Sequence, residues 1–237
     1  MRIHVADTYY WLALSMVSGL GNAGYRSLIE SFGDPEAVFE ARVSDLMKVD
    51  GIRENIAKKI ADREFAADPE TELKNLKKHG GRIITYWDPS YPLLLREIPS
   101  PPIILYIKGI DIPGDLDFVA VVGSRNPTQY GLKAAELIGF GLASRGVGVV
   151  SGMARGIDSA AHRGCLRGKG FTVAVLGTGI DVVYPASNRK LFDRIVENGA
   201  VITEFPMGSP PEPKHFPIRN RIISGLSRGV VVVEATK

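Results

Sequence analysis

The sequence predicts an α/β protein in which a small all-α region precedes a doubly wound, mainly parallel Rossmann-like sheet. Three observations support this prediction. The first 80 residues contain helix-start signals and helical periodicity, the residues beyond them alternate short apolar runs with helical stretches, and several of those runs end in glycine-containing turns. We therefore expect a helix-hairpin-helix-like domain over residues 1–80 and a Rossmann-like domain over residues 81–237.

Short helices are predicted in the first 80 residues. Asp34-Pro35 and Asp68-Pro69 each combine an N-cap residue with proline at the first helical position, which is a strong helix start. A further helix ends at Gly33, and its apolar face at i, i+3, i+4 and i+7 comprises Tyr25, Leu28, Ile29 and Phe32. The turns at 19–21 and 50–52 each precede a helix, so we expect a pair of helix-hairpin-helix-like units.

From Arg82 onward, β-rich runs replace the helical pattern. A proline-rich link over 87–102 can be neither a regular helix nor a central strand. The apolar runs from residue 118 onward are continuous rather than alternating, which indicates strands buried on both faces of a parallel sheet between helices. Right-handed crossovers between such strands produce the doubly wound fold. The expected strands are 82–86, 103–107, 118–122, 147–150, 172–176, 200–203 and 229–233.

Charge is divided unevenly along the chain. Residues 1–116 contain 14 Lys and Arg against 17 Asp and Glu, a net charge of −3, whereas residues 117–237 contain 15 against 9, a net charge of +6. A polyanion would be steered toward the C-terminal half. Because the helical half is acidic, protein packing is favoured over DNA binding for its hairpins.

The composition is that of a soluble globular protein, with 45% hydrophobic and 23% charged residues. No apolar run reaches the roughly 18 to 20 residues that span a bilayer, and the N-terminus lacks the pattern of a signal peptide, so we expect a cytoplasmic protein with no membrane partner. The single cysteine, Cys165, has no partner for a disulfide or metal site and is expected to be a small buried apolar residue.

Glycine-containing turns follow three of the expected parallel strands, at the sheet edge where ligands bind in such folds. The turns are Gly123-Ser124-Arg125, the segment from Gly152 to Arg155, and Gly177-Thr178-Gly179. Any one of them could need glycine only for a tight turn. Their recurrence together with Arg125 and Arg155, and with Arg219 and Arg221 on the next crossover, predicts phosphate binding, because arginine can donate two hydrogen bonds to one phosphate.

No cofactor is expected. A dinucleotide site would need G-x-G-x-x-G after the first strand, whereas Gly123 is followed by Ser124-Arg125. A Walker loop would need G-x-x-x-x-G-K-[ST], and Gly168-Lys169-Gly170 lacks both the loop and the hydroxyl. NAD and ATP are therefore poorly supported, and no cluster of metal-ligating residues is predicted.

Four segments in the C-terminal half resemble the motifs of the DNA processing protein A (DprA, also called Smf) family. A G-[ST]-R loop, an S-G-x-A-x-G-I-D segment, a G-x-G-x-D-x-x-Y-P segment and an F-P-x-R-N-R-I-I-[SA]-G-L-[SA] segment occur in family order at 123–125, 151–158, 177–185 and 216–227. The match covers nearly everything from Arg82 onward. The helical region similarly resembles the small SAM-like domain that precedes the main domain in many DprA proteins.

The resemblance implies a non-enzymatic protein that binds single-stranded DNA, forms a homodimer and loads the RecA recombinase in natural transformation and recombination. Ser124 and Arg125 match the family's phosphate-binding loop, and the segment from Phe216 to Arg221 matches its basic aromatic segment, which suits sequence-independent binding. The full predicted contact set is Gly123, Ser124, Arg125, Gly152, Arg155, Gly177, Gly179, Phe216, Arg219, Asn220 and Arg221.

Several of these residues have alternative roles. Phe216 can anchor its helix in the core instead of stacking on a base. Arg221 can pair internally with Glu204 or Asp181, and Asn220 can cap or fix a loop. Asp158 and His162 stand four residues apart on a helix, a spacing compatible with catalysis or a metal, although an orienting or capping role is favoured.

Two other functions compete with DNA binding. One is a nucleotide hydrolase of the lysine-decarboxylase-like Rossmann group, with Glu204 as the candidate acid, although the expected P-G-G-x-G-T loop is absent. The other is a protein-interaction scaffold with incidental basic loops. The DprA family continues beyond the strand near Glu234 with a G-S-[LI]-x-T-A helix, so we expect the Rossmann-like domain to be truncated at its C-terminus.

Overall fold

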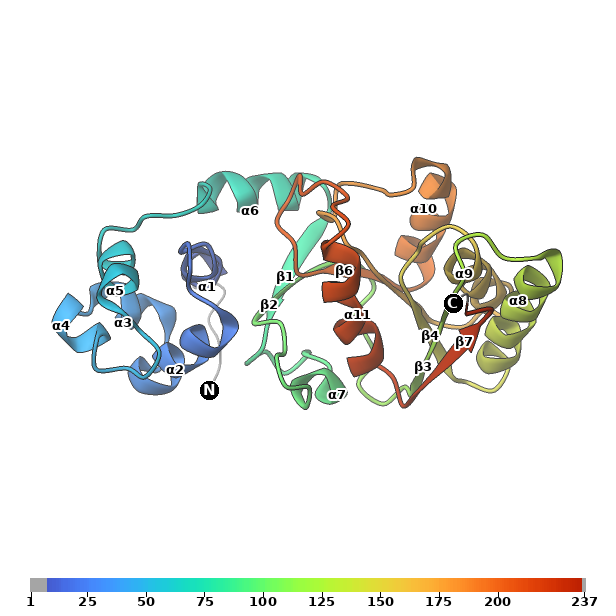
Figure 1. The fold of residues 1–237 in the computed structure, drawn as a ribbon, viewed down its shortest axis with the longest axis horizontal. Helices are drawn as coiled ribbons and strands as arrows, with labels where there is room; N and C mark the ends of the chain where they lie inside the picture. The colour runs from blue at the N-terminus through green and yellow to red at the C-terminus, as the bar shows by residue number, and fades with distance from the viewer. Residues whose placement is uncertain (1–7, 236–237) are drawn as a thin grey trace.

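A computed structural model describes residues 8–235, and its N-terminal part is a cluster of short helices (Figure 1). The predicted helix starts are confirmed, because the Asp34 carboxylate accepts a hydrogen bond from the Ala37 N–H at 2.8 Å and Asp68 accepts one from the Thr71 N–H at 2.9 Å. The helices are α1 (Thr8–Ser15), α2 (Asn22–Phe32), α3 (Pro35–Glu40), α4 (Val43–Leu46), α5 (Glu54–Ala61) and α6 (Pro69–Lys78).

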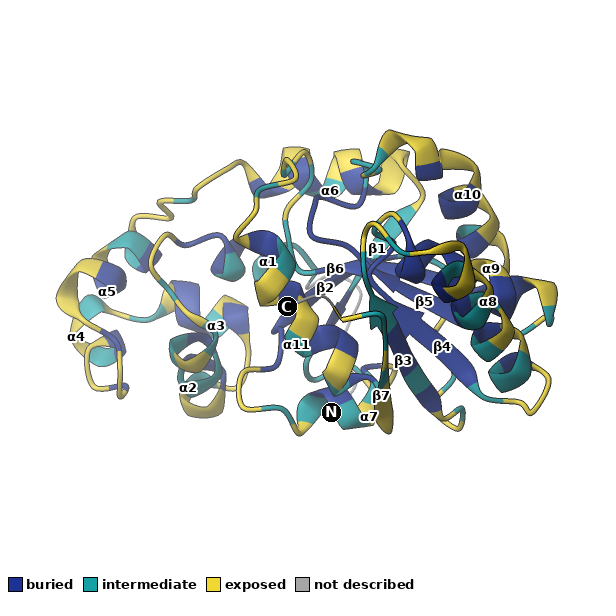
Figure 2. Cartoon of the chain, turned by 45° about the vertical axis from the view of Figure 1, so that its right-hand side comes forward, coloured by how far each residue is buried: buried dark blue, intermediate teal, exposed yellow. Residues whose placement is uncertain are grey.

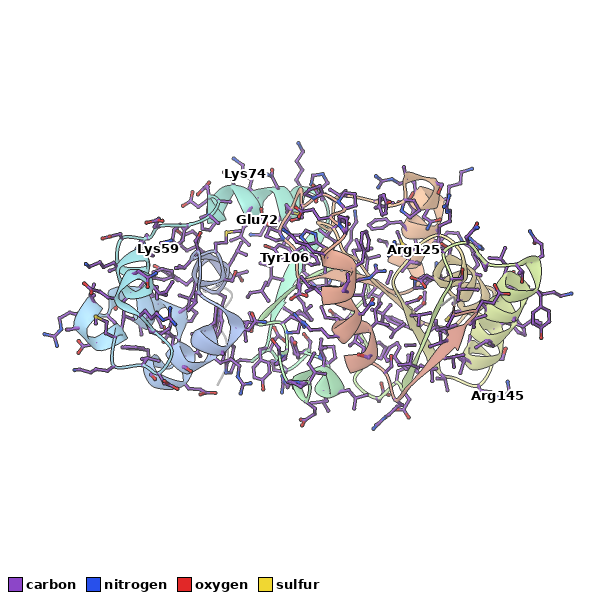
Figure 3. The ribbon with its side chains drawn as sticks, in the orientation of Figure 1. Lys59, Glu72, Lys74, Tyr106, Arg125 and Arg145 are labelled. Atoms are coloured by element: carbon purple, nitrogen blue, oxygen red, sulfur yellow. The ribbon has the colours of Figure 1, made fainter. Side chains whose placement is uncertain are left out.

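The helical region is joined to the rest of the molecule by buried contacts. Glu72 on α6 is 7% exposed, and its carboxylate accepts hydrogen bonds from the Tyr106 hydroxyl at 2.9 Å and from the Met207 N–H at 2.7 Å (Figure 3). The Trp11 ring lies 4.9 Å from the Trp87 ring across the same boundary. Since the two parts share a core, their division into separate domains near residue 80 stays a prediction.

A seven-stranded sheet forms the rest of the fold, in the order β1-β2-β6-β5-β4-β3-β7. The central strands and β7 run parallel, while β1 and β2 pair antiparallel at the far edge. This confirms the α/β, mainly parallel fold. The strands are β1 (Gly81–Thr85), β2 (Ile104–Gly109), β3 (Phe118–Gly123), β4 (Gly148–Ser151), β5 (Thr172–Val175), β6 (Ala200–Thr203) and β7 (Gly229–Val233).

Helices cover both faces of the sheet (Figure 2). On one face Val121 and Val149 pack against α8 (Gln129–Ala143) and α9 (Ile157–Arg167), beside α10 (Arg189–Asn198). On the other face Val150 and Val173 pack against α11 (His215–Gly225), which contacts α7 (Leu93–Arg96). Because successive strand residues point to opposite faces, continuous apolar strands fill both layers. Within residues 8–235, no helix combines the length and apolarity needed to cross a membrane.

The burial expected for the last strand is wrong. Among residues 8–235, β7 pairs only with β3, at the edge of the sheet, and Val230 and Val232 are 50% and 57% exposed. The apolar run predicted a strand correctly, but the same run cannot distinguish a central position from an edge, because that depends on the order of strands in the sheet.

Candidate nucleic-acid interface

The three glycine-containing loops lie at one edge of the sheet, as the sequence predicts. β3, β4 and β5 are parallel neighbours, so their carboxyl ends meet there. The N-terminal turn of α11 reaches the same edge, since the His215 Nδ1 atom lies 3.1 Å from the Gly177 carbonyl oxygen. Residues from the three loops and from α11 can therefore act on a single ligand.

The glycines serve close packing more than anion binding. A side chain at Gly152 would collide with the Arg219 guanidinium, and one at Gly177 would come within 3.1 Å of the Phe216 ring. Backbone donors in the loops are also engaged internally, because the Gly179 N–H donates to the Ser209 carbonyl oxygen at 3.0 Å. The loops thus position side chains, and those side chains are the candidate ligand contacts.

Arg125 and Phe216 form the exposed part of the site. The Arg125 guanidinium lies 4.9 Å from the centroid of the Phe216 ring, and within residues 8–235 no carboxylate lies within 4 Å of it. Phe216 is half-buried, and its ring lies 5.8 Å from that of Tyr184, which is 48% exposed. A cation beside an accessible ring can contact a phosphate and a base at the same time.

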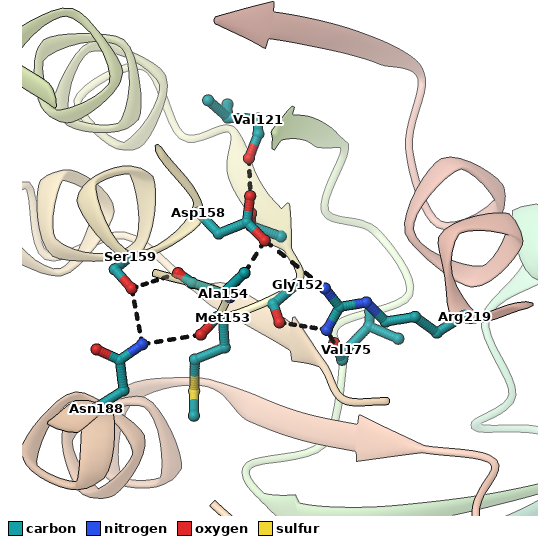
Figure 4. Close-up of polar contacts among 10 residues, drawn as sticks. Val121, Gly152, Met153, Ala154, Asp158, Ser159, Val175, Asn188 and Arg219 are labelled. Atoms are coloured by element: carbon teal, nitrogen blue, oxygen red, sulfur yellow. Dashed lines mark hydrogen bonds and ion pairs between the residues drawn. The ribbon is translucent and has the colours of Figure 1, made fainter. Parts of the chain in front are cut away.

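The sequence predicts that Arg219 contacts a phosphate, but the structure places this residue in the interior. Its side chain is buried, and Nη1 donates to the carbonyl oxygens of Gly152 and of Val175, the latter at 2.7 Å (Figure 4). Its Nη2 lies 3.8 Å from an oxygen of the buried Asp158. Arg219 therefore links the ends of β4 and β5 to α11 and is unavailable as a surface grip.

For Asp158 and Arg219, burial shifts each pKa in one direction and the charge of the partner shifts it in the other. Burial raises the pKa of Asp158. The Arg219 charge and the Ala154 N–H stabilise the carboxylate and oppose this rise. Burial also lowers the pKa of Arg219 to about 10; Asp158 opposes this effect and Arg125 adds to it. Arg219 therefore stays charged at neutral pH. The two charges offset each other inside the protein.

Arg221 forms an internal ion pair, the alternative to a phosphate contact. It pairs with Glu204, whose pKa burial raises despite the arginine. This contact engages the candidate acid of the hydrolase alternative in an ion pair. The capping or loop-fixing role considered for Asn220 is wrong, because the residue lies exposed inside α11. Its side chain is exposed, and its contact with DNA stays a prediction.

The other candidate chemical groups lie in the interior. His162 is fully buried, and its Nδ1 is 2.7 Å from the Thr172 hydroxyl rather than near Asp158. Cys165 is buried, as expected, and burial raises the pKa of its thiol to about 11. Within residues 8–235, no group of three His, Cys, Asp or Glu side chains lies close enough to hold a metal ion.

One residue at the carboxyl ends of the parallel strands, Glu234, was not predicted from the sequence as part of the site. Glu234 follows β7, and its carboxylate accepts hydrogen bonds from the Thr128 N–H, at 2.8 Å, and from the Thr128 hydroxyl at the start of α8. A negative charge at a helix start is stabilising. Only the pairing of β7 with β3 brings these residues together, so the sequence contained no local signal for the contact.

Comparisons with known proteins agree with this architecture. The model of the family described as DNA recombination-mediator protein A matches residues 82–237. Protein Smf of Synechocystis is 42% identical over 97% of this chain, and DprA of Streptococcus pneumoniae is 40% identical over 92% of it. The chain spans 59% of the length of the Synechocystis protein and 75% of that of the Streptococcus pneumoniae protein.

Two solved structures are similar to the fold. The match with the X-ray structure of DNA processing protein A from Streptococcus pneumoniae covers 100% of this chain and 80% of the Streptococcus pneumoniae chain, with a TM-score of 0.83 and 35% identity. The second is DNA processing protein A from Helicobacter pylori, described for its unique single-stranded DNA binding mode; it covers 65% of this chain and 70% of its own, with a TM-score of 0.57 and 29% identity. By family model, sequence identity and fold, this chain belongs to the DNA recombination-mediator protein A family of DprA and Smf proteins.

Proposed function

We propose that this chain binds single-stranded DNA without regard to sequence at the carboxyl edge of its sheet. The observation that supports this most is the exposed Arg125 guanidinium beside the Phe216 ring, with no carboxylate within 4 Å among residues 8–235. Every nucleotide offers a phosphate to the cation and a π-face to the ring. The single-stranded DNA binding described for the Helicobacter pylori relative supports the same function.

The proposed role is that of a mediator rather than an enzyme. The bound strand is delivered to the RecA recombinase in the cytoplasm, during recombination and natural transformation. The family description as a recombination mediator supports this role. Arg125 holds a phosphate and Phe216 stacks on a base, while Arg219 positions the loops from inside.

Arg125→Ala is expected to weaken poly-dT and mixed-sequence single strands by similar factors, because a phosphate contact acts on every sequence alike. The magnitude of the slope of log affinity against log salt should fall by roughly 0.7, the share of one counterion released from a single strand. Fluorescence anisotropy with labelled strands across a salt series measures both quantities.

The matched control is Arg145→Ala. Arg145 is exposed at the end of α8 before β4, at the opposite edge of the sheet from Arg125 (Figure 3). Arg145→Ala removes the same charge as Arg125→Ala, but away from the proposed site. Affinity and salt slope should therefore stay close to those of the parent. Equal effects of the two substitutions would refute a specific phosphate contact at Arg125 and leave only a general effect of net charge.

We also propose that the chain self-associates through its sheet-containing region, where β7 leaves an exposed strand edge. Sedimentation velocity at micromolar concentration should show a dimer. A monomer over the whole concentration range would contradict the proposal for this chain.

A further inference from the structure

The Arg125 loop separates two open grooves of different charge. The first, of about 640 Å³, lies on the α11 and β7 side, and we call it the Glu234 groove. The second, of about 340 Å³, lies on the α9 side, and we call it the arginine groove. Arg125 lines both, so the charges on their other walls decide where a phosphate backbone can run.

The Glu234 groove is poorly suited to a chain of phosphates. Besides Arg125, its charged lining residues are the carboxylates Glu234 and Asp158 and the arginine Arg219. The buried Arg219 guanidinium lies 3.8 Å from Asp158 and offsets that charge, so among residues 8–235 Glu234 is left as the unpaired carboxylate of this groove. Glu234 also engages the Thr128 N–H and hydroxyl, so the chain's own carboxylate occupies the position at the start of α8 where an anion would be stabilised. A phosphate entering there would meet like charge and a donor already in use.

The arginine groove has the opposite character. Arg125 from the β3–α8 loop, Arg155 from the β4–α9 loop and Arg163 from α9 line it, and no Asp or Glu does. All three arginines are exposed, and among the described residues no carboxylate lies within 4 Å of any of them. Three guanidinium groups around one groove repel each other, and bound anions would relieve that repulsion.

A buried hydrogen-bond network fixes the floor of the arginine groove. The Asn188 amide donates to the Met153 carbonyl oxygen at 2.9 Å and to the Ser159 hydroxyl oxygen at 2.8 Å (Figure 4). The Ser159 hydroxyl donates in turn to the Ala154 carbonyl oxygen at 2.6 Å. These bonds hold the β4–α9 loop, which contains Arg155, against the start of α9. The arginines therefore project from a backbone ordered before DNA binds.

We propose that the sugar-phosphate backbone of the bound single strand lies in the arginine groove. Arg155 and Arg163 contact the phosphates next to the one held by Arg125, and the bases turn toward Phe216, whose ring lies beside the Arg125 guanidinium and is not among the lining residues of the arginine groove. This inference rests on the proposed function and assigns the arginine groove to the phosphates and the Phe216 ring to the bases. Arg163 becomes a DNA contact that lies outside the recognised motifs.

Arg163→Ala and Arg155→Ala should each weaken binding of a poly-dT strand about tenfold at low salt, the factor of one charge-assisted contact. Each should also reduce the magnitude of the salt slope by roughly 0.7. Arg145→Ala is again the control, expected to match the parent. Circular dichroism of each variant should match the parent, because all three side chains are on the surface.

An abasic strand of equal length separates phosphate contacts from base contacts. Arg163→Ala should weaken abasic and poly-dT strands by the same factor, whereas Phe216→Ala should weaken poly-dT and leave the abasic strand nearly unaffected. If Arg163→Ala and Arg155→Ala bind like Arg145→Ala while Arg125→Ala is weakened, the backbone does not use the arginine groove and the inference is wrong, although the proposed function stands. If the parent binds no single strand, the proposed function itself fails.

Discussion

Arg219→Met is expected to lower the free energy of unfolding by about 3 to 5 kcal/mol, the range seen when one partner of a buried ion pair is removed. The substitution leaves the Asp158 carboxylate buried without its cation, and it removes the donor from the carbonyl oxygens of Gly152 and Val175. Methionine fills much of the arginine volume, so cavity formation contributes little. Urea denaturation followed by circular dichroism measures the loss.

A double substitution separates the ion pair from packing. Adding Asp158→Asn to Arg219→Met should restore part of the lost stability, because the buried charge is then removed together with its partner. Arg163→Met, on the exposed face of α9, should change stability by less than about 0.5 kcal/mol. If Arg219→Met costs under 1 kcal/mol and lowers the salt slope of DNA binding, Arg219 is the surface phosphate contact that the sequence predicts.

Acid is expected to destabilise the protein through His162. Its Nδ1–H donates to the Thr172 hydroxyl oxygen, because that hydroxyl donates to the Val149 carbonyl oxygen at 2.8 Å, and its Nε2 has no partner among residues 8–235. Burial, reinforced by Arg219 and Arg163, lowers the pKa of His162 from 6.5 to about 3. Between these values the unfolded chain binds a proton that the native protein does not.

The free energy of unfolding should therefore fall as pH drops through 6.5, with a slope from this residue that approaches about 1.4 kcal/mol per pH unit. The Asp158 and Glu204 carboxyls, whose pKa values burial raises, act in the opposite direction, so the comparison is with His162→Gln. From pH 6.5 to 4.5 the stability of the parent relative to this variant should decline by about 2.3 kcal/mol, because half of the unfolded chains already carry the proton at pH 6.5. A constant difference over that range would show that His162 is not held neutral.

The strands and helix starts could be predicted from the sequence because their signals are local. Continuous valine and isoleucine runs fill both faces of a central strand, and Asp-Pro pairs cap helices wherever the helices pack. The edge position of β7 could not be predicted, since its run Gly229–Val233 is as apolar as that of a central strand. Its exposure follows from having only β3 as a neighbouring strand in the described part of the chain.

The site was predicted less completely, for a physical reason that Arg219 illustrates. An arginine on a helix is ordinarily exposed. Arg219 is buried only because Gly152, 67 residues away, leaves space for its guanidinium and because the carbonyl groups at the ends of β4 and β5 need donors. Arg125 and Phe216 follow from the motifs. The contact of Glu234 with Thr128 spans 106 residues and has no sequence signature.

The most direct test of single-strand binding is a salt titration of the parent protein with poly-dT, a mixed-sequence single strand and a duplex of equal length. We expect both single strands to bind with similar affinities, and their log affinities to fall linearly with log salt at similar slopes. We also expect weaker binding of the duplex, whose stacked bases cannot reach Phe216. Absence of binding at low salt, or tighter binding of the duplex, would contradict the assignment of this sheet edge as a single-strand site.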